Sequence, residues 1–115
     1  MVEHPRRGDV YWTDLEPTRG SEQGGRRPAL IVQNDVGNRF APLTIVVPLT
    51  RSTPKKNYPF MVQVPGTGGT DASWVHCGHV RTIDKSRLVE GVLAQLDQAT
   101  MHRVDDALRA SLGLY

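Results

Sequence analysis

Cysteine and long apolar stretches are both scarce in this sequence. The single cysteine, Cys77, excludes an internal disulfide and is typical of a protein from a reducing compartment. No apolar run approaches the roughly 20 residues that a membrane-spanning helix requires. The polar start, Met1 to Arg7, lacks the apolar centre of a signal peptide. We therefore expect a cytoplasmic protein with no membrane contact.

Net charge and aromatic content are also low. The formal charge is +2 and the sequence pI is about 9.0, which permits an anionic partner without requiring one. Aromatic residues make up 6% of the chain and few fall in the basic loops, which argues against extensive base stacking. The 115 residues suffice for one domain with its own core, so we assign residues 1–115 to a single domain.

Short β-branched runs bounded by Gly, Asn and Pro predict a chain made mainly of strands. Residues 33–39 are predicted to form a polar turn and residues 1–8 a loose arm. The expected strands cover residues 9–15, 27–33, 43–50, 60–64, 73–83 (broken at Gly78) and 87–93.

The end of the chain predicts one helix. Asp97 is a plausible N-cap and Gly113 suits the C-terminal cap, so the helical region spans residues 97–113. Its apolar stripe, at spacings of three and four, consists of Met101, Val104, Leu108 and Leu112. Five to seven short antiparallel strands followed by one helix favour a small barrel or half-barrel whose open face the helix covers.

The stretch from Gly20 to Thr50 carries the strongest functional signal. Arg27 stands at the start of one expected strand and Thr50 at the end of the next, so antiparallel pairing would bring them to the same end of the sheet. A guanidinium fork beside a hydroxyl suits a phosphate group. If the substrate is RNA, attack by the ribose 2′-hydroxyl needs neither a metal nor an external nucleophile. Arginine is a poor base, and His79 is one alternative acceptor for the 2′ proton.

A metal site or a cysteine nucleophile is a weaker interpretation. On a regular strand Cys77 and His79 would point to the same face, but two ligands are too few for zinc. A Cys–His pair would also lack an evident oxyanion hole. The carboxylates between Asp9 and Glu22 form no cluster of the kind that a metal-dependent nuclease needs. We therefore expect no metal and no cofactor.

Several motifs together point to a family. They include Gly8–Trp12 (G-D-V-Y-W), the loop Pro17–Gly25 and the following Arg27–Val32 (R-P-A-L-I-V). The match continues through Ile45–Thr50, Val80–Lys85 and Val104–Leu108. Over about residues 8–114 the chain resembles the MazF/PemK toxins of bacterial toxin–antitoxin systems.

The resemblance implies an SH3-like barrel with a C-terminal helix, acting as a homodimer. It also implies a sequence-specific, metal-independent endoribonuclease that cuts single-stranded RNA to 2′,3′-cyclic phosphate (or 3′-phosphate) and 5′-hydroxyl ends. The family's catalytic arginine and threonine fall on Arg27 and Thr50. A cognate MazE-like antitoxin would bind across the dimer and occlude the RNA groove. Further substrate contacts are expected from Ser21, Glu22, Gln23, Arg26, Arg51, His79 and Arg81.

One segment departs from the family, and two other functions remain open. His76–His79 occupies a position where acidic or amide residues are expected, so the resemblance does not give the base preference there. CcdB-type toxins share the barrel and poison DNA gyrase, but their determinants lie at the end of the helix, typically with a Trp. Here Trp12 and Trp74 lie elsewhere. The other alternative is a nucleic-acid-binding barrel without catalysis.

Overall fold

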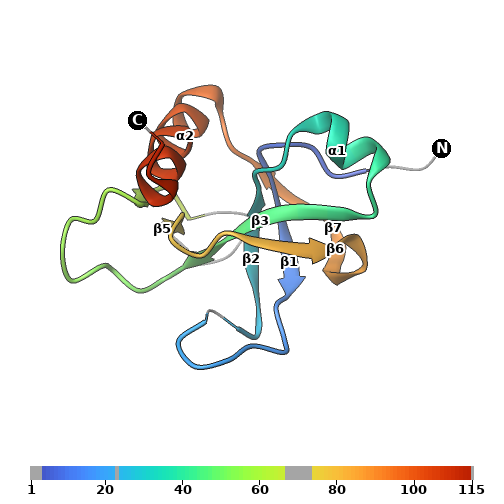
Figure 1. Cartoon of the computed structure of the whole chain (residues 1–115), viewed down its shortest axis with the longest axis horizontal. Coiled ribbons are helices and arrows are strands. Elements are labelled where there is room, and N and C mark those ends of the chain that lie inside the picture. Colours follow the sequence, from blue (N-terminus) through green and yellow to red (C-terminus); the bar gives the residue numbers. More distant parts are fainter. Residues whose placement is uncertain (1–3, 23, 67–73, 115) are drawn as a thin grey trace.

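The computed structural model describes residues 4–22, 24–66 and 74–114, which form an antiparallel sheet followed by a helix (Figure 1). In chain order the elements are β1 (Asp9–Asp14), β2 (Arg26–Ile31), α1 (Asp35–Phe40), β3 (Leu43–Thr50), β4 (Met61–Gln63), β5 (Trp74–His76), β6 (Arg81–Asp84), the 3₁₀ turn η1 (Lys85–Arg87), β7 (Leu88–Gln95) and α2 (Gln98–Leu112). The strand order is β4-β5-β3-β2-β1-β7, and β6 also pairs with β3.

The predicted mainly β chain with a C-terminal helix is confirmed. Within the described residues, however, β4 does not pair with β7, so the sheet stays open instead of closing into a barrel.

Strand β3 joins the two parts of the sheet. One of its edges pairs with β2, with Ala29 opposite Pro48. Its other edge pairs with both β6 and β5, with Val46 opposite Arg81 and Leu49 opposite Val75. Residues 77–80 connect β5 to β6 and form a turn, in which the His79 N–H donates to the His76 carbonyl at 3.3 Å. The break predicted at Gly78 is therefore confirmed, as a turn that separates two strands.

Both faces of β2 are buried, which accounts for its uninterrupted apolar run. Leu30 belongs to a cluster that includes Val47 and, from α2, Val104. Its neighbours Ala29 and Ile31 point the other way, into a second cluster with residues of β3 and β6. Side chains alternate along a strand, so this arrangement fixes which residues of β2 face which core. A one-residue slip of β2 would exchange the two sets.

Helix α1 occupies the segment that was predicted to be a polar turn, and that prediction is wrong. Asn34 caps the helix, because its side-chain oxygen accepts from the Gly37 N–H at 2.8 Å. Asp35 in the first turn and Arg39 in the last suit the helix dipole. The buried Asn38 then fastens the helix to the sheet by accepting a hydrogen bond from the Thr44 hydroxyl at 2.7 Å.

Residues 4–8 are anchored, in contrast to the loose arm expected from the sequence. Arg7 makes contacts with three parts of the fold. Its backbone N–H donates to Asp35 at 2.8 Å and its Nε–H to the Val32 carbonyl at 2.9 Å. Its terminal nitrogen pairs with Asp105 of α2 at 2.5 Å. The start of the described chain therefore bridges α1, the end of β2 and α2.

Helix α2 has the expected ends and most of the expected stripe. The Asp97 side chain accepts from the Thr100 N–H at 2.8 Å, and Gly113 adopts the left-handed conformation with φ +70°. Met101 and Val104 are buried, whereas Leu112 is 57% exposed and therefore lies outside the core stripe. Neither this helix nor α1, the two α-helices among the described residues, is long and apolar enough to cross a membrane.

Candidate active site

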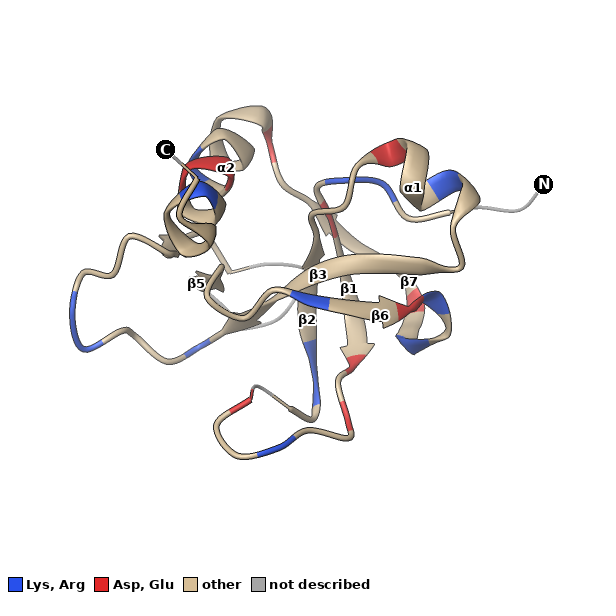
Figure 2. Cartoon of the chain, viewed as in Figure 1, with Lys and Arg blue, Asp and Glu red and all other residues tan. Residues whose placement is uncertain are grey.

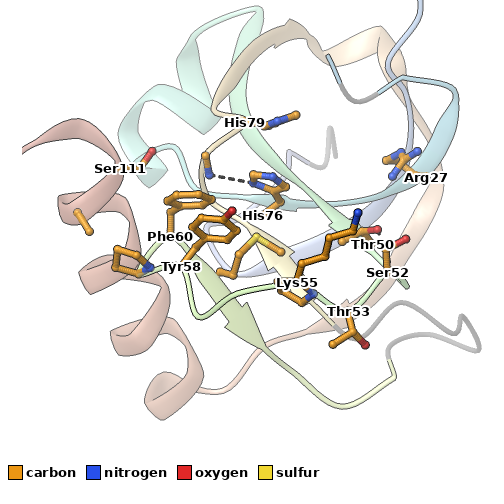
Figure 3. Close-up of a pocket in the computed structure, with 15 residues that line it drawn as sticks. Arg27, Thr50, Ser52, Thr53, Lys55, Tyr58, Phe60, His76, His79 and Ser111 are labelled. Atoms are coloured by element: carbon orange, nitrogen blue, oxygen red, sulfur yellow. Dashed lines mark hydrogen bonds between the residues drawn. The ribbon is translucent and has the colours of Figure 1, made fainter. Parts of the chain in front are cut away.

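Arg27 and Thr50 meet at one end of the sheet, as the sequence predicted. The pairs Ala29–Pro48 and Ile31–Val46 fix an antiparallel register that, continued outward, sets Arg27 opposite Thr50. Both residues line a groove of about 970 Å³ (Figure 3). Strand pairing alone is therefore enough to bring a guanidinium and a hydroxyl to the same opening.

Local hydrogen bonds orient these two side chains. The Nε–H of Arg27 donates to the Gly24 carbonyl at 2.9 Å, which leaves the terminal nitrogens of the fork as further donors. The Thr50 hydroxyl oxygen accepts from the Ser52 N–H at 3.2 Å, so its own proton can be donated elsewhere. An arginine fork and a hydroxyl donor are the groups that hold phosphoryl oxygens.

The groove is electropositive. Its charged lining residues are Arg27 and Lys55, and no Asp or Glu lines it among the residues that the structure describes. Figure 2 shows further Lys and Arg positions along the loop between β3 and β4 (residues 51–60) and at the start of β2. Hydroxyls of Ser52, Thr53 and Ser111 also line the groove. This surface favours an anionic ligand with several acceptor oxygens.

The groove also contains a continuous row of rings, which sequence reasoning missed. Tyr58 and Phe60 stack with centroids 5.0 Å apart, and Phe60 and His76 stack at 5.5 Å. The row ends at His79, whose ring centroid is 4.1 Å from that of His76. Tyr58 and Phe60 precede β4, His76 ends β5 and His79 lies in the turn after it, so only the pairing of Met61 with His76 could have suggested that the rings meet. We refer to Tyr58, Phe60, His76 and His79 as the aromatic row.

A glycine makes the turn between the two histidines possible. A Cβ on Gly78 would lie 2.8 Å from the His76 ring and 3.1 Å from the Phe60 ring. The Gly78 N–H donates to His76 Nδ1 at 3.1 Å (dashed in Figure 3), which leaves Nε2 as the protonated nitrogen of the neutral ring. Any larger residue at position 78 would push these rings apart.

Both histidines favour the neutral form. Burial lowers the pKa of His76 below its ordinary value, and the nearby His79 lowers it further. Burial also lowers the pKa of His79, and Arg27 adds to this effect while Glu22 opposes it. His79 lines the groove together with Arg27 and a second, smaller cavity together with Glu22, so it lies between the two.

Cys77 points away from the two histidines, so the common face that a regular strand would give Cys77 and His79 does not form. The turn at Gly78 breaks the strand alternation, and the thiol is fully buried in the core beside α2. Burial, with a smaller contribution from Asp105, raises the pKa of this thiol to about 12. Within the described ranges no three His, Cys, Asp or Glu side chains lie close enough together to hold a metal ion.

The loop after β1 is fixed at its base and open at its tip. The Leu15 N–H donates to the Gly25 carbonyl at 3.0 Å, and the Gly25 N–H donates to Glu16 at 2.7 Å. At the tip, Ser21 and Glu22 are exposed, and Glu22 accepts from the Arg19 N–H at 3.1 Å. Gln23 lies outside the described residues. The loop thus leaves Ser21 and Glu22 exposed, and neither is among the residues that line the groove.

Glu22, His79 and Arg81 line a smaller cavity of about 90 Å³ next to the groove. Arg81 donates from one terminal nitrogen to the Leu15 carbonyl and from the other to the Pro17 carbonyl at 3.4 Å. Arg87 similarly donates to the Asp14 carbonyl at 3.2 Å. The geometry therefore gives Arg81 a part in holding the base of the loop, whereas the sequence suggested a direct substrate contact.

The remaining predicted contact residues lie at the margin. Arg26 is exposed at the start of β2, where its backbone lies opposite Asp14 in the β1–β2 register. Arg51 is exposed in the bend directly after Thr50. Neither is among the residues that line the groove.

Comparison with known proteins gives consistent matches over almost the whole chain. Residues 6–112 match the family described as PemK-like, MazF-like toxin of type II toxin–antitoxin system. The chain is 45% identical over 111 residues to Endoribonuclease EndoA of Bacillus subtilis (strain 168), covering 95% of each protein.

Two solved structures are also similar. The crystal structure of MazF from Deinococcus radiodurans has a TM-score of 0.83 at 31% identity, with 97% of this chain and 99% of that one covered. An endoribonuclease in complex with its cognate antitoxin from Mycobacterial species has a TM-score of 0.78 at 31% identity, with 96% and 97% covered. Over nearly its whole length, the chain that carries the Arg27–Thr50 groove is therefore similar to proteins named MazF or endoribonuclease.

Proposed function

Because this chain belongs to the PemK-like, MazF-like family of type II toxins, we propose that it is an endoribonuclease that cuts single-stranded RNA. The observation that carries the proposal is the Arg27–Thr50 pair at the rim of an electropositive groove without a lining carboxylate among the described residues. The relative named Endoribonuclease EndoA, at 45% identity, supports the same reaction.

The proposed reaction is an internal phosphoryl transfer. The ribose 2′-oxygen forms a bond to phosphorus and the bond to the 5′-oxygen breaks, so the products are a 2′,3′-cyclic phosphate and a 5′-hydroxyl. Arg27 would stabilise charge on the non-bridging oxygens, and Thr50 would donate one hydrogen bond to them. The 2′ proton passes to a base, and the departing 5′-oxygen takes a proton from water or from that protonated base. The step uses no external nucleophile, and we propose that it proceeds without a metal. His79, a neutral imidazole near Arg27, is suited to accept the 2′ proton.

The chain's partners follow from the same proposal. The solved complex of a similar endoribonuclease with its cognate antitoxin supports a MazE-like antitoxin as the inhibitor of this protein. Leu112 and Leu114, which are 57% and 59% exposed beside the groove-lining end of α2, support a homodimer in which they are covered. A bacterial cytoplasmic location would place the protein with its messenger RNA substrate.

Cleavage of a long single-stranded RNA in excess chelator tests the proposal. The native protein should give discrete fragments with 5′-hydroxyl ends, and Arg27→Ala and Thr50→Ala should give none while retaining the native circular dichroism spectrum. Arg39→Ala is the matched control, since Arg39 lies on α1 outside the groove lining. Full activity of a folded Arg27→Ala variant would overturn the proposed site. Inhibition of gyrase supercoiling without RNA cleavage would instead support the CcdB-type alternative.

A further inference from the structure

The groove places a row of aromatic rings beside its phosphate-binding groups. We propose that the aromatic row, Tyr58, Phe60, His76 and His79, is a stacking surface for successive bases of single-stranded RNA. This inference rests on the proposed endoribonuclease function and adds to it the part of the site that holds the bases. Arg27 and Thr50 would act on the phosphate, whereas the row would hold the bases of nucleotides on one side of it.

The geometry of the row suits stacking. Neighbouring rings from Tyr58 to His76 are inclined by only 17° to one another, and all four rings line the same groove. Rings that stack on one another cover each other's inner faces, so a base would extend the stack at its end, where Tyr58 is 42% exposed. Figure 3 shows Tyr58 and Phe60 beside each other and His76 between them and the Arg27 side of the groove.

Core packing does not account for the whole row. Phe60 packs against the hydrophobic cluster under α2, which explains why that ring is held in place. Tyr58, however, is 42% exposed, although it stacks on Phe60 and lines the groove. An exposed tyrosine held against a second ring is a preformed surface for a flat ligand, because stacking on it requires little further ordering.

Charge around the row favours nucleotides over other flat ligands. The imidazoles of His76 and His79 are held neutral by burial, so they behave as aromatic surfaces at neutral pH. Lys55 and Arg27 line the same groove as the aromatic row and would supply positive charge for the phosphates between bases. Aromatic faces next to a basic groove are the usual means of binding single-stranded nucleic acid, whose bases are not already stacked in a duplex.

The test separates base stacking from attraction to the phosphate backbone. The first probe is a fluorescently labelled, mixed-sequence single-stranded RNA with a 2′-O-methyl group at every ribose, which cannot be cut because the attacking hydroxyl is blocked. The second probe is inorganic polyphosphate, which carries the charge but has no bases. Binding to the native protein, Tyr58→Ala and Tyr58→Phe is measured by fluorescence anisotropy, with polyphosphate as the competitor. Phe40→Ala is the matched control, because Phe40 is 72% exposed on α1 and lies outside the groove lining.

We expect Tyr58→Ala to weaken binding of the blocked RNA about tenfold and to leave polyphosphate binding unchanged. Tyr58→Phe keeps the ring and should bind like the native protein, as should Phe40→Ala. Equal RNA binding by the native protein and Tyr58→Ala would overturn the stacking proposal, and so would an equal loss for both probes. If the native protein still cuts unmodified RNA, either of those two results would leave the proposed endoribonuclease function standing. Failure of the native protein to bind the blocked RNA would overturn the stacking proposal, and failure to cut unmodified RNA would overturn the endoribonuclease.

Discussion

Replacing Arg27 by lysine would show whether the guanidinium fork is needed or positive charge alone is enough. Lysine keeps one charge but loses the Nε–H that donates to the Gly24 carbonyl at 2.9 Å. It also loses the planar pair of terminal nitrogens that can hold two phosphoryl oxygens together. The variant therefore changes the position and the number of donors while the charge of the groove stays the same.

The size of the effect can be worked out from these two losses. Removing one preorganised donor to a developing oxyanion typically costs about 10²–10³ in kcat, roughly 2.7–4 kcal/mol. The retained ammonium can still make one charge-assisted hydrogen bond, a type that contributes about 1.5–3 kcal/mol. We therefore expect Arg27→Lys to cut RNA about 100-fold more slowly than the native protein, and Arg27→Ala to be slower still.

Single-turnover cleavage of a short RNA that contains one mapped cut site measures the chemical step. Arg39→Lys is the control, since Arg39 lies over the Phe40 ring at 5.1 Å on α1 and does not line the groove. That control should cut at the native rate. An Arg27→Lys rate within a few-fold of native would refute the reasoning, because it would mean that a point charge at this position is sufficient.

Three further outcomes follow from the buried and aromatic groups. Cys77, with its pKa raised to about 12, should react with Ellman's reagent only after unfolding in urea, and rapid reaction of the native protein would contradict its burial. Because the pKa values of His76 and His79 lie below the ordinary 6.5, the unfolded chain binds protons more readily than the native one. This part of the stability should be complete above pH 6.5 and fall as the pH drops through the folded values, and glutamine at both positions should reduce the slope seen in urea unfolding. Val104→Ala removes two fully buried methyl groups and should lower the free energy of unfolding by roughly 2–3 kcal/mol, against about 0.5 kcal/mol or less for the exposed Val92→Ala.

The Arg27–Thr50 pair could be predicted because its geometry is local. Two strands that follow one another in the chain, β2 and β3, pair in a register that buried residues such as Leu30 and Val47 enforce. Once the strands are recognised, the residues at their ends are brought together without any long-range information. The same reasoning gave the caps and core stripe of α2, where Asp97, Val104 and Gly113 follow local rules.

Other features were missed for identifiable physical reasons. Gly37 is a poor helix former, so the sequence favoured a turn over α1. The cap at Asn34 and the acidic Asp35 were the signal that could have revealed the helix. The aromatic row depends on the pairing of β4 with β5, in which Met61 lies opposite His76. Tyr58, Phe60 and His79 lie outside the strands, so spacing along the chain does not show that the rings meet.

The role of Arg81 shows a different limit. The family resemblance made it a candidate for substrate contact, yet its guanidinium donates to carbonyls at the base of the loop after β1. Residue type alone does not distinguish an arginine that binds a ligand from one that holds a loop in place. Only the directions of its hydrogen bonds, which depend on the packing of Leu15 beneath the loop, decide between the two.

The contribution of α2 to the groove has a consequence for how the activity arises during translation. Ala110 and Ser111 form part of the groove wall, although Arg27 and Thr50 are made much earlier. Asp105, on the same helix, is the residue that holds Arg7. A nascent chain whose α2 is still inside the ribosome therefore has Arg27 and Thr50 but lacks part of the groove wall. We expect the groove to be complete only once α2 has been synthesised and has packed on the sheet.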